Sequence, residues 1–265
     1  MTTWTEPQEG RGLPERLGTR LEPLHPVGAT LAVAVAGYLV LVGVALALGT
    51  FVTQVVVGGS LGRGDLDVAR WFAERRTPFR NDLSLIGSYF AETVTVVVIV
   101  AIVLVVLAVK RHWPLFGLVV VTLTLEAAVY VAATYAITRN RPAVPRLEDL
   151  IVADSFPSGH TAAAVALYGS LAIVVWAETR SRGWRTLAIL LAVLGPIIVA
   201  TSRVYRGMHN PTDVICGALI GMGCIAVGYL AVRTGVSVAR ERRADDDDDA
   251  RAPERLRLSR EAVAS

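Results

Sequence analysis

The sequence is short of cysteine, lysine and charge. It contains two cysteines, and of its 26 basic residues only Lys110 is a lysine. Two cysteines cannot build a disulfide framework, and these two show no metal-binding spacing. Charged residues make up 18% of the 265 residues and hydrophobic residues 53%, whereas a soluble domain averages about 25% and about 45–50%. This composition excludes a disordered chain, a collagen and a disulfide-rich scaffold.

The hydrophobic residues are gathered in six long runs. A membrane-spanning helix needs about 20 mostly apolar residues, and a chain in lipid must satisfy its backbone hydrogen bonds internally. A soluble all-α protein with buried helices is the alternative, but six such runs leave too little polar surface for it. The sequence therefore predicts six transmembrane helices. The runs are residues 27–62, 93–109, 113–138, 155–177, 186–202 and 214–232, and Glu126 is the only charged residue in them.

We expect an all-α, polytopic membrane protein in three parts. Residues 1–24 form a polar N-terminal arm, and residues 25–234 form the six-helix membrane domain. Residues 235–265 form a charged tail that we predict to be disordered, because the run of aspartates at 245–249 is typical of a solvated segment. Between the first and second spans, residues 63–85 mix aromatic and charged side chains, which predicts a short amphipathic helix on the membrane surface.

The orientation follows from Lys and Arg near the ends of the spans. With six spans, both termini lie on one side of the membrane. That side carries twelve of these basic residues, against ten on the other side. Because cytoplasmic segments carry the excess of positive charge, we expect cytoplasmic termini. The first apolar run starts late and is long, so we interpret it as a span and expect no cleavable signal peptide.

Residues suited to catalysis lie in two of the connections. Only 18 residues separate Arg141 from His160, so these two lie on one side of the membrane. His160 and His209 are separated by 48 residues, which two spans and a tight turn fill. The chain therefore crosses the membrane and returns, and both histidines reach the same face. The residues are Arg139, Arg141, Pro157, Ser158, Gly159 and His160 before the fourth span, and Arg203, His209 and Asp213 before the sixth.

The starts of two helices sharpen this interpretation. The fourth span begins at Pro157-Ser158-Gly159, so the N–H groups of Ser158, Gly159 and His160 point out of a helix N-terminus. Free N–H donors and the helix dipole make such an end an anion site. The sixth span begins at Asn210-Pro211, which are typical of a helix cap and of a first helical position.

Two histidines, several arginines and a helix N-terminus together favour phosphoryl transfer. Arginine forks match phosphate geometry and stay charged. A neutral histidine can attack phosphorus, with Asp213 as a partner that orients it, and the other histidine can protonate the leaving oxygen. We expect no metal and no cofactor, because the arginines and N–H groups can stabilise the charge of the transferring group.

These residues carry a resemblance to a known family. Arg141-Pro142, then the segment from Pro157 to His160, then Ser202-Arg203-x5-His209-x3-Asp213 resemble the three signature motifs of the type-2 phosphatidic acid phosphatase superfamily. The resemblance implies that His209 is the nucleophile that forms a phosphohistidine, that Asp213 is its partner, and that His160 is the acid. It also implies that Arg141, Ser158, Gly159 and Arg203 hold the phosphate.

The resemblance implies a metal-independent membrane phosphatase. Its substrate would be a prenyl diphosphate, which we rank first, or a glycerophospholipid phosphate monoester. We expect it in a bacterial-type inner membrane, with termini in the cytoplasm and the site on the outer face. Its partners would be the lipid substrate and the bilayer, with no nucleic acid. A lipid phosphotransferase and a non-catalytic lipid-phosphate binder are the alternatives.

The first motif departs from the family pattern at one position. The family has a lysine seven residues before Arg141, and this chain has Thr134 there. We expect Arg139, or Arg206, to supply the missing phosphate-binding cation; a plain loop charge is the alternative for Arg139. Asp213 has an alternative as well, because an acid in the first turn stabilises a helix N-terminus without touching His209.

Overall fold

A computed structural model describes residues 12–149 and 153–264, and these residues contain helices and connections but no strand. Six helical segments are long and apolar enough to cross a membrane, which confirms the predicted all-α fold with six spans. The elements are α1 (Leu13–Leu21), α2 (Pro26–Phe51), the π-helical turn η2 (Val52–Val56), α3 (Ser60–Glu74), α4 (Pro78–Tyr89), α5 (Thr93–Val109), α6 (Trp113–Ala136), α7 (Gly159–Glu178), α8 (Arg182–Tyr205) and α9 (Pro211–Ala264).

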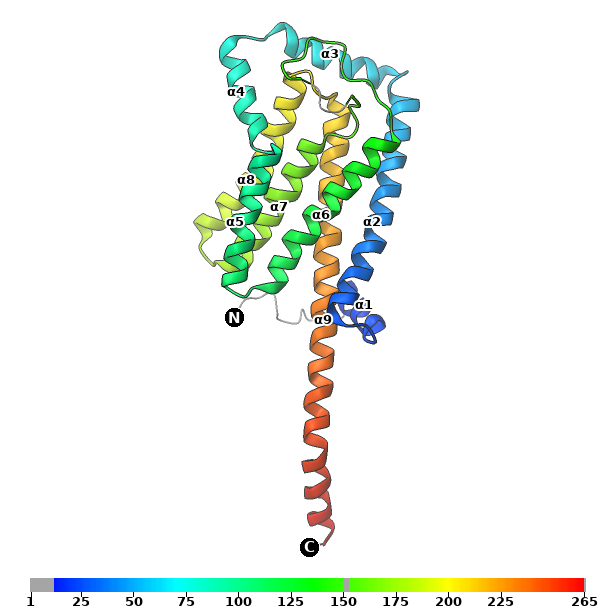
Figure 1. The fold of residues 1–265 in the computed structure, drawn as a ribbon, viewed down its shortest axis with the longest axis vertical. Coiled ribbons are helices and arrows are strands. Elements are labelled where there is room, and N and C mark those ends of the chain that lie inside the picture. Colours follow the sequence, from blue (N-terminus) through cyan, green and yellow to red (C-terminus); the bar gives the residue numbers. More distant parts are fainter. Residues whose placement is uncertain (1–11, 150–152, 265) are drawn as a thin grey trace.

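The spans stand side by side in an elongated bundle, in which α9 packs against α2, α6 and α7 (Figure 1). Leu41 of α2, Val129 of α6 and Ile220 of α9 share one buried cluster. Large side chains on the outside of the bundle, such as Ile102 and Val105 of α5, are more than half exposed. Outward-facing aliphatic residues suit contact with lipid, where helices are held together by close packing rather than by exclusion of water.

Two glycines of α9 bring that helix close to the start of α7. A Cβ atom at Gly217 would lie 2.5 Å from the carbonyl oxygen of Ser158, and one at Gly221 would lie 2.7 Å from that of Ala162. Any side chain at these positions would push α7 away. The glycines therefore fix the distance between the two helix starts that the sequence analysis singled out.

Residues 60–89 contain two helices where the sequence predicted one. The amphipathic α3 lies across one end of the bundle, as predicted for a surface helix (Figure 1). It is followed by α4, which forms the second candidate span together with α5. The break between them has a local cause: the Thr77 hydroxyl accepts a hydrogen bond from the Arg80 N–H at 3.3 Å, and Pro78 opens the new helix.

The charged tail, which the sequence predicts to be disordered, is helical in the backbone that the structure describes. The last helix continues through residues 235–264 as part of α9 (Figure 1). A helix that is already formed needs no new nucleus, and the tail is rich in Ala and Arg, which favour helix. The predicted N-terminal arm also contains structure, because α1 packs against α9. Both α1 and the far end of α9 lie away from α3 (Figure 1).

The polar connections converge at the α3 end of the bundle. The N–H of Leu147, between α6 and α7, donates to the carbonyl of Arg206, between α8 and α9, at 3.1 Å. Within the first of these connections, the Ser155 N–H donates to the Arg139 carbonyl at 2.8 Å. The prediction that His160 and His209 reach one face is therefore confirmed.

Candidate active site

The starts of α7 and α9 are joined by hydrogen bonds. The Ser158 N–H donates to the carbonyl oxygen of Asp213 at 3.2 Å, and the Ser158 hydroxyl lies 3.0 Å from that of Thr161. Ser158 is fully buried, and its N–H takes part in the contact between the two helices. This N–H is therefore not available to bind phosphate, which differs from the sequence prediction. The first N–H groups of a helix have no partner inside it. At α7 these include the N–H groups of Gly159 and His160, two of the three that the sequence analysis named.

His209 is a buried histidine with a defined tautomer. Its Nδ1 lies 2.7 Å from the carbonyl oxygen of Ser155. A carbonyl only accepts hydrogen bonds, so Nδ1 carries the proton and Nε2 keeps a lone pair. Burial lowers the pKa of His209 well below its ordinary value, and the charges of Arg203 and Arg141 lower it further. His209 is therefore a neutral imidazole whose Nε2 keeps its lone pair.

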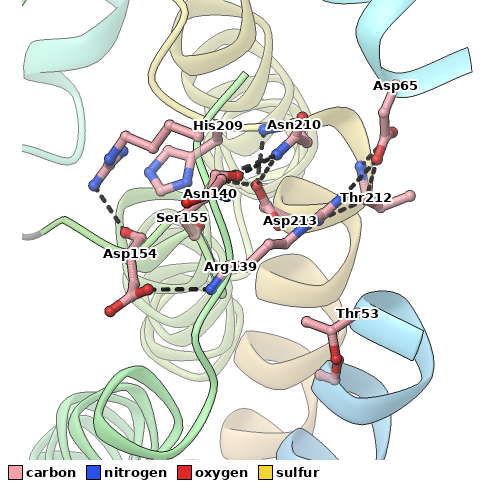
Figure 2. Close-up of polar contacts among 12 residues, drawn as sticks. Thr53, Asp65, Arg139, Asn140, Asp154, Ser155, His209, Asn210, Thr212 and Asp213 are labelled. Carbon is pink, nitrogen blue, oxygen red and sulfur yellow. Dashed lines mark hydrogen bonds and ion pairs between the residues drawn. The ribbon is translucent and has the colours of Figure 1, made fainter. Parts of the chain in front are cut away.

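Asp213 does not contact His209 directly, which corrects the expected pairing. Its Oδ2 accepts hydrogen bonds from the Ser155 hydroxyl and from the Asn210 N–H, the latter at 2.8 Å. Bonding of a first-turn acid back to the cap residue is a capping-box arrangement. Asp213 thus caps α9 and holds Ser155, and it reaches His209 through Ser155 (Figure 2).

Arg139 also differs from its predicted role. Its Nη1 donates to Asp213 Oδ1 and, at 2.8 Å, to the Thr212 hydroxyl, and its Nη2 donates to Asp65 Oδ2 at 2.8 Å. The side chain is buried between two carboxylates (Figure 2). Arg139 therefore does not replace the missing phosphate-binding cation, because its charge is already engaged by Asp65 and Asp213.

Arg206, the second proposed replacement, is also occupied. Its guanidinium donates to the Glu148 carboxylate, to the Ser84 hydroxyl at 3.1 Å, and to the carbonyls of Asn81 and Leu147. Neither arginine therefore takes the place of the family lysine, at whose position this chain has Thr134.

Arg203 and Arg141 lie close enough to His160 and His209 for their charges to act on both histidines. Arg203 Nη1 donates to the Ser88 hydroxyl at 2.8 Å and to Glu148 Oε2 at 2.6 Å. Burial on its own would raise the pKa of Glu148, but the charges and hydrogen bonds of Arg203 and Arg206 outweigh it and lower that pKa. Arg141 donates to the carbonyls of Met208 and Asp154, so it links the two connections.

His160 stands in the first turn of α7, half-buried and close enough to act electrostatically on His209. The adjacent Gly159 packs against the ring of Tyr130: a Cβ at Gly159 would lie 2.7 Å from the ring. The structure thus brings His160, His209, Arg141, Arg203 and the start of α7 together. Within residues 12–149 and 153–264, no group of three or more His, Cys, Asp or Glu side chains could hold a metal ion.

Three residues of the site were not singled out from the sequence. Ser155 contacts His209 through its backbone, which leaves no trace in residue type. Glu148 stands among other loop charges, and Asp65 stands on an amphipathic helix where an acid usually faces water. Asp65 is buried and Asp67 on the same helix is exposed, and only the folded chain shows this difference.

Comparison with known proteins assigns the segment that carries the motifs. The model of the PAP2 superfamily matches residues 115–236. Residues 115–236 are a PAP2 superfamily domain. This PAP2 domain runs from α6 into α9 and contains all three motifs that carried the resemblance, which is thereby confirmed. Its match excludes α2 to α5, and with them Asp65 and Ser88.

Three relatives of the PAP2 domain have curated names. Sphingosine-1-phosphate phosphatase 2 of Mus musculus is 36% identical over 34% of this chain and 25% of its own length. Bacitracin transport permease protein BcrC of Bacillus licheniformis is 33% identical over 31% of this chain and 35% of its own. The putative undecaprenyl-diphosphatase YbjG of Escherichia coli (strain K12) is 41% identical over 28% and 33%. The matches therefore span between a quarter and about a third of these proteins.

A solved structure shares the fold over a larger part. The crystal structure of a transmembrane PAP2-type phosphatidylglycerolphosphate phosphatase from Bacillus subtilis has a TM-score of 0.62, covers 72% of this chain and 93% of that chain, and is 21% identical in sequence. At this identity the likeness establishes a common fold.

Proposed function

We propose that the protein is an integral-membrane phosphatase that hydrolyses a lipid phosphate or diphosphate through a phosphohistidine at His209. The observation that carries the proposal is the state of His209: buried, neutral, and bound through Nδ1 to the Ser155 carbonyl, so that Nε2 holds the reactive lone pair. The names of the PAP2 relatives, among them a sphingosine-1-phosphate phosphatase and a putative undecaprenyl-diphosphatase, support a lipid substrate.

The reaction has two steps. His209 Nε2 attacks phosphorus, the bond to the leaving oxygen breaks, and His160 gives that oxygen its proton. Water then attacks phosphorus, His160 takes a proton from the water, the P–Nε2 bond breaks, and inorganic phosphate leaves His209 neutral again. Arg141, Arg203 and the N–H groups of Gly159 and His160 stabilise the charge on the phosphoryl oxygens in both steps.

We rank a prenyl diphosphate first among substrates, followed by glycerophospholipid phosphates. The site lies at the α3 end of the bundle, away from α1 (Figure 1). We propose cytoplasmic termini, with which the site would face the outer side of a bacterial inner membrane. A reporter fused to the C-terminus that is active only in the cytoplasm tests this orientation; one active outside the cytoplasm reverses it.

The decisive experiment measures phosphate release from a panel of lipid phosphates by purified protein in detergent, with a chelator present. We expect release by the wild type and loss of at least about 10³-fold in His209→Ala and His160→Ala. Activity that needs metal, or full activity in His209→Ala, contradicts the mechanism. Binding of a lipid phosphate without release identifies a non-catalytic binder, and transfer to an added alcohol identifies a phosphotransferase.

A further inference from the structure

An aspartate on the surface helix α3 is buried. Asp65 is 5% exposed, whereas Asp67, two residues further along, is exposed. A surface helix normally turns its acids to water, and an ionised carboxylate is buried only where it is paired and hydrogen-bonded. The burial of Asp65 therefore reflects specific partners.

Those partners belong to the candidate active site. Asp65 Oδ1 accepts a hydrogen bond from the Thr212 N–H at 3.1 Å, and Asp65 Oδ2 accepts one from Arg139 Nη2 at 2.8 Å (Figure 2). Thr212 stands in the first turn of α9, where N–H groups lack partners inside the helix. Asp65 thus caps α9 from outside while it pairs with Arg139.

The contacts continue from Arg139 to the nucleophile. Arg139 Nη1 pairs with Asp213, Asp213 accepts the Ser155 hydroxyl, and the Ser155 carbonyl accepts the His209 Nδ1–H. Every side chain in this series is at least nine-tenths buried, and Figure 2 shows them in one continuous group. We call the set Asp65, Arg139, Asp213 and Ser155 the support network of His209.

The charges of the support network match the proposed chemistry. Attack by Nε2 leaves the Nδ1 proton in place, so the phosphorylated ring carries a positive charge. Two carboxylates with one guanidinium give the network a net negative charge beside that ring. Loss of the Asp65 charge would remove this excess and would also free one side of Arg139.

We propose that Asp65 is a positioning residue for the reaction at His209: it holds Arg139 and the start of α9 so that Asp213 and Ser155 fix the imidazole. The proposal rests on the proposed phosphatase function. It assigns a role to α3, which lies outside the PAP2 match, and it explains why Arg139 is not directed at the substrate.

The experiment compares Asp65→Asn with Asp67→Asn, which makes the same charge change on the same helix at an exposed position. We expect kcat to fall roughly tenfold or more in Asp65→Asn with KM within about twofold, and no change in Asp67→Asn. Asp65→Glu should recover part of kcat. The acidic limb of the kcat pH profile should move in Asp65→Asn alone, a readout that lost stability would not produce.

A double variant tests the coupling. If Asp65 acts through Arg139, Asp65→Asn should cost much less in an Arg139→Gln background than in the wild type. Independent, multiplying losses would overturn the proposal, as would wild-type kcat in Asp65→Asn while His209→Ala is inactive. The last result leaves the phosphatase function intact; a wild type that releases no phosphate overturns both. If Asp65→Asn does not fold, Asp65→Glu against Asp67→Glu carries the same comparison.

Discussion

Two charged clusters flank His209, and they differ in how closed they are. In the support network, Asp65 and Asp213 are 5% and 0% exposed and share Arg139 between them. The second cluster joins Arg203 and Arg206 through Glu148, whose side chain is 25% exposed. We call it the arginine cluster.

This difference in exposure indicates which cluster can exchange ion-pair partners. A buried ion pair that loses one partner leaves an uncompensated charge, so the support network keeps one arrangement. A partly exposed carboxylate such as Glu148 can leave Arg203 for water when a phosphate arrives. We therefore expect the support network to fix geometry and Arg203, within the arginine cluster, to accept the anion.

Among the variants that test this comparison, Arg203→Ala should have the largest effect on activity. The variant removes a charged donor to the phosphoryl oxygens, and we expect kcat/KM to fall about 10³-fold. Steady-state phosphate release measures it. A loss below tenfold would place Arg203 outside the phosphate site and would make the two clusters alike.

Arg139→Ala should come next, with a loss of roughly 100-fold that falls mainly on kcat. Arg139 contacts Asp65 and Asp213 rather than the phosphate site, so KM should change little. Arg146→Ala, at an exposed position in the same connection, is the matched control and should keep full activity. A rise in KM at constant kcat would return Arg139 to a substrate-binding role.

The pH dependence of activity should show a smaller effect, which reports the protonation state of His209. Its lowered pKa keeps the imidazole neutral at pH values where an ordinary histidine, with a pKa near 6.5, is already protonated. We expect kcat/KM to hold as pH falls through 6.5 and to drop, by up to about tenfold per unit, only at lower pH. An acidic limb centred at or above 6.5 would contradict a buried, neutral nucleophile.

Glu148→Gln should produce the smallest change, and in the opposite direction. Neutralising Glu148 leaves Arg203 and Arg206 less compensated, so inorganic phosphate should inhibit about three- to fivefold more strongly. Asp149→Asn, an exposed neighbour with the same charge change, should leave the inhibition constant unchanged. Weaker inhibition in Glu148→Gln would show that Glu148 holds Arg203 in place as rigidly as Asp65 holds Arg139.

Much of this arrangement could be predicted from residue types and spacing. Apolar runs revealed the spans, and the positions of His160 and His209 placed both at one membrane face. The direction of a side chain has no such signal: Arg139 and Arg141 stand two residues apart, yet Arg139 turns to Asp65 and Asp213 while Arg141 links two connections.

Contacts through the backbone were equally hidden. The Ser155 carbonyl orients His209 in the place expected for Asp213, and any residue type offers a carbonyl. The pairing of Arg139 with Asp65 could not be predicted from the sequence for another reason. Asp65 lies 74 residues earlier, on a helix whose pattern predicted only a membrane surface.

The pairing of Asp65 with Arg139 has a consequence for dissection and transfer of the protein. A segment cut at residues 115–236 keeps the three motifs but leaves Arg139 without the carboxylate from α3. Grafted onto another six-helix scaffold, it should be inactive unless the host supplies an acid at the corresponding place. The same dependence should appear among homologues: a chain that lacks either Asp65 or Arg139 should also lack or replace the other. The smallest segment that carries a complete site therefore begins in α3.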